Sequence, residues 1–302
     1  MLDWPSWTRR CYPRSCRSFD WVADRDADVV LLGADGMLGR AFRERMAAAG
    51  LRVRAPAQSA LDLTRLGSIE QGLGEPRVVV NCAAHSDVDA AEEHGPLATA
   101  VNGTGVGWLA QVCAARGALL VHFSTDYVFD GLATSPYTVD HQVMPINAYG
   151  RSKARGEELL RQSGCRYLLI RTSWLYAPWG RNFVRTISSL AQQRNVLRVV
   201  DDQRGRPSSA LGLTRITLAL LDTEALGAYH VCDGGMCSWY EFAREIVAQR
   251  KLACRVEPCS SPEFPRPARR PAWSVLDLSQ TESRIGPMTH WKKALAEVLG
   301  RL

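Results

Sequence analysis

The sequence predicts an α/β protein, with a doubly wound parallel sheet followed by a smaller C-terminal lobe. Two observations lead to this prediction. From Val29 onward, short apolar runs alternate with amphipathic helices, a pattern typical of βαβ units on a parallel sheet. Beyond about residue 176 the pattern changes to short mixed segments, with a stretch rich in proline and arginine at 258–271. We expect this lobe to close over the carboxyl edge of the sheet, where open α/β sheets bind their ligands.

The elements of the sheet are expected in a regular order. A buried strand at 29–32 precedes a helix at 37–49, which ends before Gly50, a position where glycine is common. Further strands are expected at 52–54, 77–81, 118–123 and 167–171, and further helices at 99–116 and 148–162. On this assignment the sheet is essentially complete by about Thr172. The predicted organisation is a poorly ordered extension at 1–27, the sheet domain at 28–175 and mainly the lobe at 176–302, with some segments returning to the sheet.

Bulk properties argue against several classes of protein. The net charge of +6 is spread over 302 residues without a run of Lys or Arg, so no nucleic-acid partner is expected. Nine cysteines form no Cys-x-x-Cys pair and six histidines no His-x-x-x-His pair, which argues against a metal site and favours a reducing compartment. No apolar stretch approaches the ~20 residues of a membrane span, and residues 1–27 lack the apolar core of a signal peptide. We therefore expect a cytoplasmic protein with no membrane association.

The turn after the first strand carries a glycine motif. Gly33, Gly36 and Gly39 are spaced Gly-x-x-Gly-x-x-Gly between a strand and a helix. Positions without side chains let the backbone approach a pyrophosphate, and the helix N-terminus supplies amide donors and a favourable dipole. The motif therefore predicts a Rossmann-type domain that binds NAD(P) over residues 28–175.

The second strand bears on the choice between NADPH and NADH. A carboxylate about 20 residues after the glycine turn usually binds the ribose 2′-hydroxyl of NAD. Here residues 55–59 contain no carboxylate, whereas Arg40 and Arg54 lie where either could meet a 2′-phosphate. Both are also compatible with ordinary surface arginines. NADPH is favoured, and NADH stays possible.

Tyr149 and Lys153 form the candidate catalytic pair. Their i,i+4 spacing places them on one face of the expected helix. A neighbouring ammonium stabilises tyrosinate and draws the tyrosine pKa towards neutrality, where proton transfer is efficient. An amphipathic helix that happens to carry both residues would show the same spacing. The strand end at 121–127 supports the catalytic interpretation, because its hydroxyls, Thr125 among them, would lie beside the nicotinamide.

With these motifs in order, the chain resembles the extended short-chain dehydrogenase/reductases and, within them, the dTDP-4-dehydrorhamnose reductase family. The resemblance runs from about Val29 to the C-terminus. It rests on the blocks at 33–39, 81–89, 101–104, 124–131, 145–153, 171–176, 202–207 and 269–271.

The resemblance implies three catalytic roles. Thr125 would hydrogen-bond the C4 oxygen of the sugar, and Tyr149 would donate the proton. Lys153 would hold the nicotinamide ribose and tune Tyr149.

The resemblance also implies binding residues. Those along the cofactor are Gly36, Met37 and Leu38 at the pyrophosphate, Asp62 and Leu63 at the adenine, and Ala84, His85 and Ser86 at its middle. Those at the deoxysugar nucleotide are Thr125, Asp126 and Trp174. A packed loop histidine is an equal alternative for His85, and a core aromatic is the alternative for Trp174. Asp87 and Asp89 are interpreted as loop or helix-cap carboxylates.

One departure concerns metal. After Pro207, where some family members carry a glutamate linked to a metal-bridged dimer, this chain has Ser208 and Ser209. The absence of this glutamate weakens the case for bound Mg²⁺. The expected oligomeric state is a monomer or a homodimer.

The implied reaction is reduction of the 4-keto group of a dTDP-4-keto-6-deoxyhexose, for instance dTDP-4-dehydro-L-rhamnose to dTDP-L-rhamnose. Two alternatives stay open. One is another nucleotide-sugar 4-ketoreductase of secondary-metabolite synthesis, and the other is a non-catalytic regulatory subunit that binds NADP(H).

Overall fold

A six-stranded parallel sheet organises the molecule. The computed structural model describes residues 29–302, so the extension predicted at 1–27 lies outside the described residues. The strand order is β10-β5-β4-β3-β1-β2. The strands are β1 (Val29–Leu32), β2 (Val53–Arg54), β3 (Val78–Asn81), β4 (Leu119–Thr125), β5 (Arg166–Thr172) and β10 (Gly227–His230). The predicted α/β class is confirmed.

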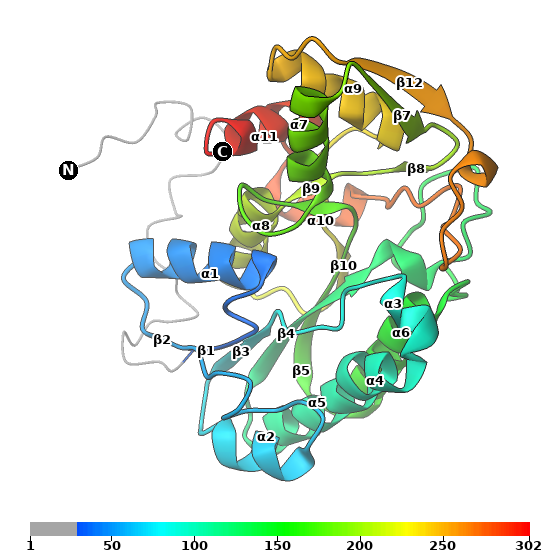
Figure 1. Cartoon of the computed structure of the whole chain (residues 1–302). Coiled ribbons are helices and arrows are strands. Elements are labelled where there is room, and N and C mark those ends of the chain that lie inside the picture. The colour runs from blue at the N-terminus through cyan, green and yellow to red at the C-terminus, as the bar shows by residue number, and fades with distance from the viewer. Residues whose placement is uncertain (1–28) are drawn as a thin grey trace.

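Helices cover both faces of this sheet (Figure 1). One face carries α1 (Met37–Ala48) and α8 (Ala210–Asp222), and the other carries α2 (Leu66–Gly72), α5 (Gly105–Ala115) and α6 (Ala148–Gln162). In β1, Val29 and Leu31 belong to the first apolar core, and Val30 and Leu32 belong to the second. Successive side chains of a strand point to opposite faces, so a strand buried on both sides is apolar throughout.

Two details differ from the sequence-based expectation. The sheet is not complete at Thr172, because β10 pairs in parallel with β5 at its edge. Its four residues, Gly-Ala-Tyr-His, lack the run of valine and leucine that made the equally short β1 and β3 recognisable. The single helix expected at 99–116 is composite: α4 (Gly95–Thr99) leads through one turn of π-helix (Ala100–Thr104) into α5. An added Cβ on Gly156 of α6 would lie 2.1 Å from the Asn102 carbonyl oxygen in this turn, so the two segments touch backbone to backbone.

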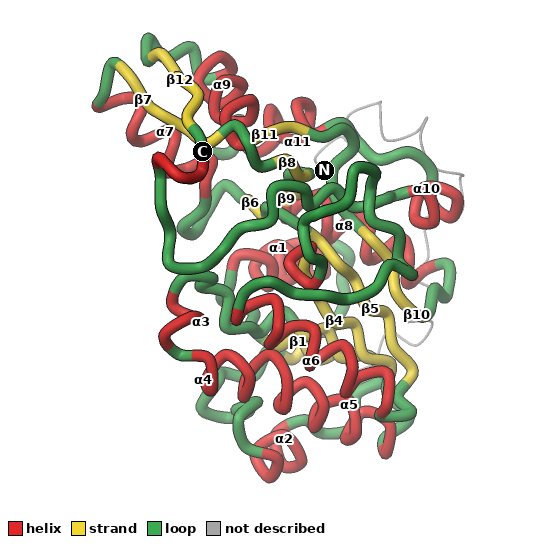
Figure 2. The backbone as a smooth tube through the Cα atoms, turned by 90° about the vertical axis from the view of Figure 1, so that its right-hand side faces the viewer, coloured by secondary structure: helices red, strands yellow, loops and turns green. Residues whose placement is uncertain are grey.

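The C-terminal lobe has an apolar core of its own. Its elements are α7 (Phe183–Gln193), β7 (Val196–Val200), α9 (Trp239–Gln249), β12 (Arg255–Cys259) and α11 (Trp291–Leu299), with β7 and β12 paired in parallel. Two short strand pairs lie outside the main sheet. In one, β6 (Leu175–Tyr176) pairs with β9 (Ser208–Ser209), and in the other, β8 (Arg204–Gly205) pairs with β11 (Cys237–Ser238). Figure 2 shows the lobe stacked on one end of the sheet.

The lobe meets the carboxyl ends of the central strands. Thr172, the last residue of β5, donates a hydrogen bond from Oγ1 to Ser208 Oγ at 2.9 Å. Two further short α-helices are α3 (Ala90–Glu93) and α10 (Ser279–Ile285). Within 29–302, no helix is long and apolar enough to cross a membrane.

Candidate active site at the carboxyl edge of the sheet

The glycine turn between β1 and α1 brings three backbone segments into contact. Gly33 has φ +70°, and a Cβ there would lie 2.6 Å from the backbone nitrogen of Ala83 in the loop after β3. Gly39, on the first turn of α1, packs against the carbonyl oxygen of Gly33. Gly36 caps α1 without a side-chain hydrogen bond, and the described first turn holds no acidic residue. The free amides and the positive end of the helix dipole therefore suit a diphosphate.

The two arginines proposed for a 2′-phosphate have different surroundings. The guanidinium of Arg54 donates to the carbonyl oxygens of Gly72, at 2.7 Å, and of Leu73, so it is engaged at the end of α2. Arg40 pairs with Glu44 at 3.0 Å on the surface, and its guanidinium lies 4.3 Å from the ring centroid of Trp179. Arg40 is therefore the more available of the two.

The loop after β3 is held by a residue that the sequence analysis left without a role. Asn102 accepts a hydrogen bond from the His85 amide and donates to the His85 carbonyl, both at 2.9 Å. The same amide nitrogen donates to Ser152 Oγ at 3.0 Å, and Ser152 donates to the Tyr149 carbonyl at 2.7 Å. Asn102 thus connects the expected cofactor loop to the helix of Tyr149. Its signal in the sequence was the 101–104 block of the family resemblance, which contains Asn102.

The other expected cofactor residues lie in loops that flank β2 and β3. Ala84 and Ser86 are exposed, and Leu63 is buried. Asp62 accepts hydrogen bonds from the amide and hydroxyl of Thr64, which lower the pKa of its carboxyl group. Within the described chain, Nδ1 of His85 is buried without a hydrogen-bond partner.

Thr125, Tyr149 and Lys153 come together at the carboxyl end of β4. Thr125 ends β4, while Tyr149 and Lys153 lie in the first two turns of α6. A Cβ on Gly150 would lie 2.1 Å from the Tyr127 carbonyl, so the absence of a side chain lets α6 approach the strand end. The ammonium of Lys153 donates to the Phe123 carbonyl at 2.6 Å.

The electrostatics of the pair differ from the expectation. Burial raises the pKa of Tyr149, the Asp126 charge raises it further, and a hydrogen bond with Thr125 opposes both. Burial lowers the pKa of Lys153 to about 8, against the opposing effect of Glu157. The expected lowering of the Tyr149 pKa is not found, because burial and the Asp126 charge raise this pKa and Lys153 is not among the groups that offset them. Tyr149 therefore stays protonated at neutral pH, as a proton donor requires.

Asp126 lies next to Thr125 with only 3% of its surface exposed. Its Oδ1 accepts from Thr125 Oγ1 at 2.9 Å, whereas Oδ2 is buried without a partner in the described chain. Burial raises the pKa of Asp126 to about 7, although the neighbouring hydroxyls of Ser274 and Thr125 oppose the shift. A buried polar atom without a partner is costly unless a ligand can pair with it.

Trp174 follows β5 in a left-handed conformation, with φ +47°. Its indole stacks on Trp239, with ring centroids 3.6 Å apart and planes 10° from parallel. One face of Trp174 is therefore covered by a residue 65 positions further along the chain, which no local pattern indicated.

The acidic residues of the 81–89 block have structural partners. Asp87 accepts from the Ala90 amide at 3.1 Å, which confirms its interpretation as a helix-cap carboxylate. Asp89 instead binds arginines from the lobe. Among residues 29–302, no group of His, Cys, Asp and Glu could hold a metal ion.

Comparison with known proteins places this geometry in a family. Residues 27–302 match the family described as RmlD substrate binding domain. The chain is 39% identical over 287 residues to a dTDP-4-dehydrorhamnose reductase of Streptomyces griseus, covering 89% of this chain and 91% of that protein. It is 38% identical over 276 residues to a Streptomyces antibioticus protein named "Probable dTDP-4,6-dihydroxy-2-methyloxan-3-one 4-ketoreductase", covering 89% and 93%.

A solved structure agrees with these relatives. The dTDP-4-dehydrorhamnose reductase of Bacillus anthracis in complex with NADP superimposes with a TM-score of 0.88 at 33% identity, covering 91% of this chain and 99% of that one. This chain therefore belongs to the dTDP-4-dehydrorhamnose reductase family of the extended short-chain dehydrogenase/reductases.

Proposed function

We propose that this protein reduces the 4-keto group of a dTDP-4-keto-6-deoxyhexose, and that its substrate is dTDP-4-dehydro-L-rhamnose, giving dTDP-L-rhamnose. NADPH, when bound, supplies the hydride that C4 accepts. Residues 28–175 would bind the dinucleotide, and the lobe formed mainly by 176–302 would bind the sugar nucleotide.

The convergence of Thr125, Tyr149 and Lys153 carries this proposal. Tyr149, held protonated by its buried surroundings, would give its proton to the C4 oxygen as the carbonyl becomes an alcohol. Thr125 would hydrogen-bond that oxygen and so orient the carbonyl. Lys153, at the same strand end, would hold the ribose hydroxyls of the cofactor. A subunit that only bound NADP(H) would have no need for all three.

The substrate and cofactor contacts are proposed on the same basis. The unpartnered Oδ2 of Asp126 would accept from a sugar hydroxyl, and Trp174 would pack on the apolar side of the 6-deoxyhexose. Gly36, Met37 and Leu38 would bind the pyrophosphate. For the 2′-phosphate of NADPH we propose Arg40 rather than Arg54, because the guanidinium of Arg54 already has two carbonyl partners.

A second candidate is a related dTDP-sugar 4-ketoreductase. The Streptomyces antibioticus relative, almost as similar as the reductases, favours keeping it. Such an enzyme would use the same catalytic residues and differ in the shape of the sugar pocket.

The assembly and location are also proposed. We expect a monomer or a homodimer in the cytoplasm. The seven cysteines in the described part of the chain are all free, which fits a reducing compartment.

One assay tests these proposals together. Purified protein is mixed with NADPH and each of several dTDP-4-keto sugars, and NADPH consumption is followed before product analysis. We expect the highest kcat/KM with dTDP-4-dehydro-L-rhamnose. A higher value with another keto sugar would favour the second candidate. NADPH binding without turnover of any keto sugar would favour a regulatory subunit.

A further inference from the structure

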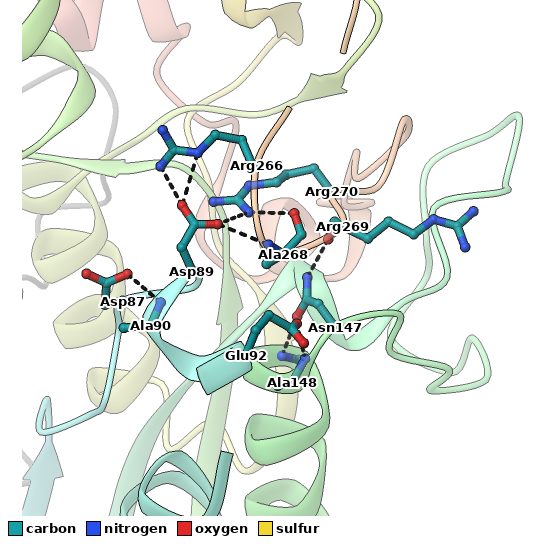
Figure 3. Close-up of polar contacts among 11 residues, drawn as sticks. Asp87, Asp89, Ala90, Glu92, Asn147, Ala148, Arg266, Ala268, Arg269 and Arg270 are labelled. Carbon is teal, nitrogen blue, oxygen red and sulfur yellow. Dashed lines mark hydrogen bonds and ion pairs between the residues drawn. The ribbon is translucent and has the colours of Figure 1, made fainter. Parts of the chain in front are cut away.

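A single carboxylate fastens a segment of the lobe beside the active site. The segment, residues 266–274, is called the strap here (Figure 3). Asp89 lies in the loop that leads from β3 to α3. Its Oδ2 accepts from Arg266 Nε at 3.0 Å, and its Oδ1 accepts from Arg270 Nη1 at 2.6 Å and from the Ala268 amide at 3.2 Å. One side chain thus fixes three positions of the strap, which lie 177 to 181 residues further along the chain.

The strap is also attached to the helix that carries Tyr149. Asn147 donates from Nδ2 to the Arg269 carbonyl at 2.9 Å, and its Oδ1 accepts from the Gly150 amide at 2.7 Å as the N-cap of α6. Figure 3 shows Asn147 directly beneath the Arg269 carbonyl, while the Arg269 guanidinium extends away from Asp89. The position of the strap and the start of α6 therefore depend on the same buried side chain.

The far end of the strap reaches a second site residue. Ser274 is buried, and its amide donates to the Arg204 carbonyl at 2.8 Å. Its hydroxyl donates to the Arg204 carbonyl at 3.4 Å, and its proximity to Asp126 lowers the pKa of that carboxyl group against the effect of burial. The strap thus runs from the Asp89 clamp, past the N-cap of the Tyr149 helix, to the carboxylate beside Thr125.

We propose that Asp89 is a positioning residue for the reductase reaction: it holds the strap docked and so keeps the substrate side of the site in its productive arrangement. Its partners are the strap arginines and the Ala268 amide, so it would act through the strap and not on the reacting atoms. The kinetic part of this proposal rests on the proposed function, whereas the docking of the strap does not.

Asp89 keeps its charge over the pH range of ordinary assays. Partial burial disfavours the ionised form, but hydrogen bonds from Arg270, Ala268 and Arg266 outweigh it and lower the pKa of Asp89 to about 2. Asp89→Asn therefore removes a charge that is always present, with almost no change in size. Asp87→Asn is the matched control, because Asp87 lies two residues earlier and pairs with Arg181 at 3.3 Å, outside the strap.

Limited proteolysis measures directly how firmly the strap is docked. Trypsin cuts after arginine unless proline follows, and Pro267 and Pro271 protect the bonds after Arg266 and Arg270. The bond between Arg269 and Arg270 is therefore the tryptic site within the strap. Its cleavage requires local opening, because the Arg269 carbonyl and the Arg270 side chain are both held.

We expect Asp89→Asn to be cut at this bond about tenfold faster or more, as measured by mass spectrometry of the fragment that begins at Arg270. Asp87→Asn should be cut at the wild-type rate, and Asp89→Glu should be cut at a rate nearer the wild type than Asp89→Asn. Equal cleavage rates for wild type and Asp89→Asn would overturn the proposal that Asp89 holds the strap in place.

Kinetics then test the positioning role. For Asp89→Asn we expect KM for the dTDP-4-keto sugar to rise about tenfold with a smaller change in kcat, while the Kd for NADPH and the melting temperature stay near wild type. Rescue by Asp89→Glu would support a charged clamp. Faster cleavage with unchanged kcat/KM would refute the positioning role. If the wild type reduces no keto sugar, the proposed function fails, and the positioning role fails with it; the proteolysis still decides whether Asp89 holds the strap.

Discussion

Replacing Asp126 with asparagine separates the contribution of this side chain to stability from its contribution to the site. Burial raises the pKa of Asp126 to about 7 from an ordinary value of 3.8, a shift of about 3 units. The folded state therefore binds this proton more tightly than the unfolded state. Between about pH 4 and pH 7 the unfolded chain loses the proton first, so the stability of the wild type falls as the pH rises. Above about pH 7 Asp126 is ionised in both states, so the full free-energy cost of burying its charge reduces the stability of the folded state.

The size of this cost follows from the shift. At about 1.4 kcal/mol per pKa unit, 3 units correspond to about 4 kcal/mol of lost stability above neutrality. Asparagine carries no charge and avoids this cost, but its amide nitrogen could occupy the place of Oδ2, which has no partner among the described residues. An unpaired buried donor costs about 1–3 kcal/mol. We therefore expect Asp126→Asn to be more stable than wild type by about 1–3 kcal/mol near pH 8, with no gain near pH 5.

Urea unfolding of wild type and variant at the two pH values measures this difference. Asp130→Asn is a control of opposite sign, because hydrogen bonds from the Tyr137 hydroxyl and the Leu132 amide lower the pKa of Asp130. That variant should be less stable than wild type near pH 8. The reasoning about Asp126 would be refuted if its asparagine variant showed the same stability difference from wild type at both pH values.

The same variant should lose activity. Asp126→Asn removes the charged acceptor expected for a sugar hydroxyl, so kcat/KM for the dTDP-4-keto sugar should fall at least about tenfold, which is about 1.4 kcal/mol of transition-state binding. The Kd for NADPH, from fluorescence titration, should not change. An unchanged kcat/KM would remove Asp126 from the site.

Three further substitutions test two other parts of the site and one buried ion pair. Tyr149→Phe should fold and bind NADPH but turn over about 10²–10⁴-fold more slowly, and near-normal turnover would exclude Tyr149 as the proton donor. Arg40→Ala should lower kcat/KM with NADPH while leaving NADH unaffected, because only NADPH has a 2′-phosphate to pair; a wild-type preference for NADH would contradict this assignment. Glu157→Gln should destabilise the protein by about 3–5 kcal/mol in urea unfolding, because Arg171 would stay buried with its bidentate partner neutralised; a loss below about 1 kcal/mol would show that the pair contributes little.

Local patterns in the sequence were sufficient for five of the six strands of the sheet and for the helix that carries Tyr149 and Lys153. The glycine turn depends on a few consecutive residues, and the i,i+4 spacing of Tyr149 and Lys153 depends on one helix. Both lie where the sequence predicted, and helix α6 spans the predicted 148–162. Such features are predictable because the residues that cause them are near neighbours along the chain.

Only the tertiary structure decided which distant groups meet. The stacking of Trp174 on Trp239, the carbonyl partners of Arg54 and the clamp of Asp89 on the strap join residues that no spacing relates. The four-residue strand β10 is defined by its pairing with β5 rather than by a pattern of its own. The raised pKa of Tyr149 is also a tertiary property, because desolvation depends on everything packed around the hydroxyl. The periodicity of a sequence indicates which face of one element lies against the core. The partner of a polar side chain, in contrast, depends on how the elements pack against one another.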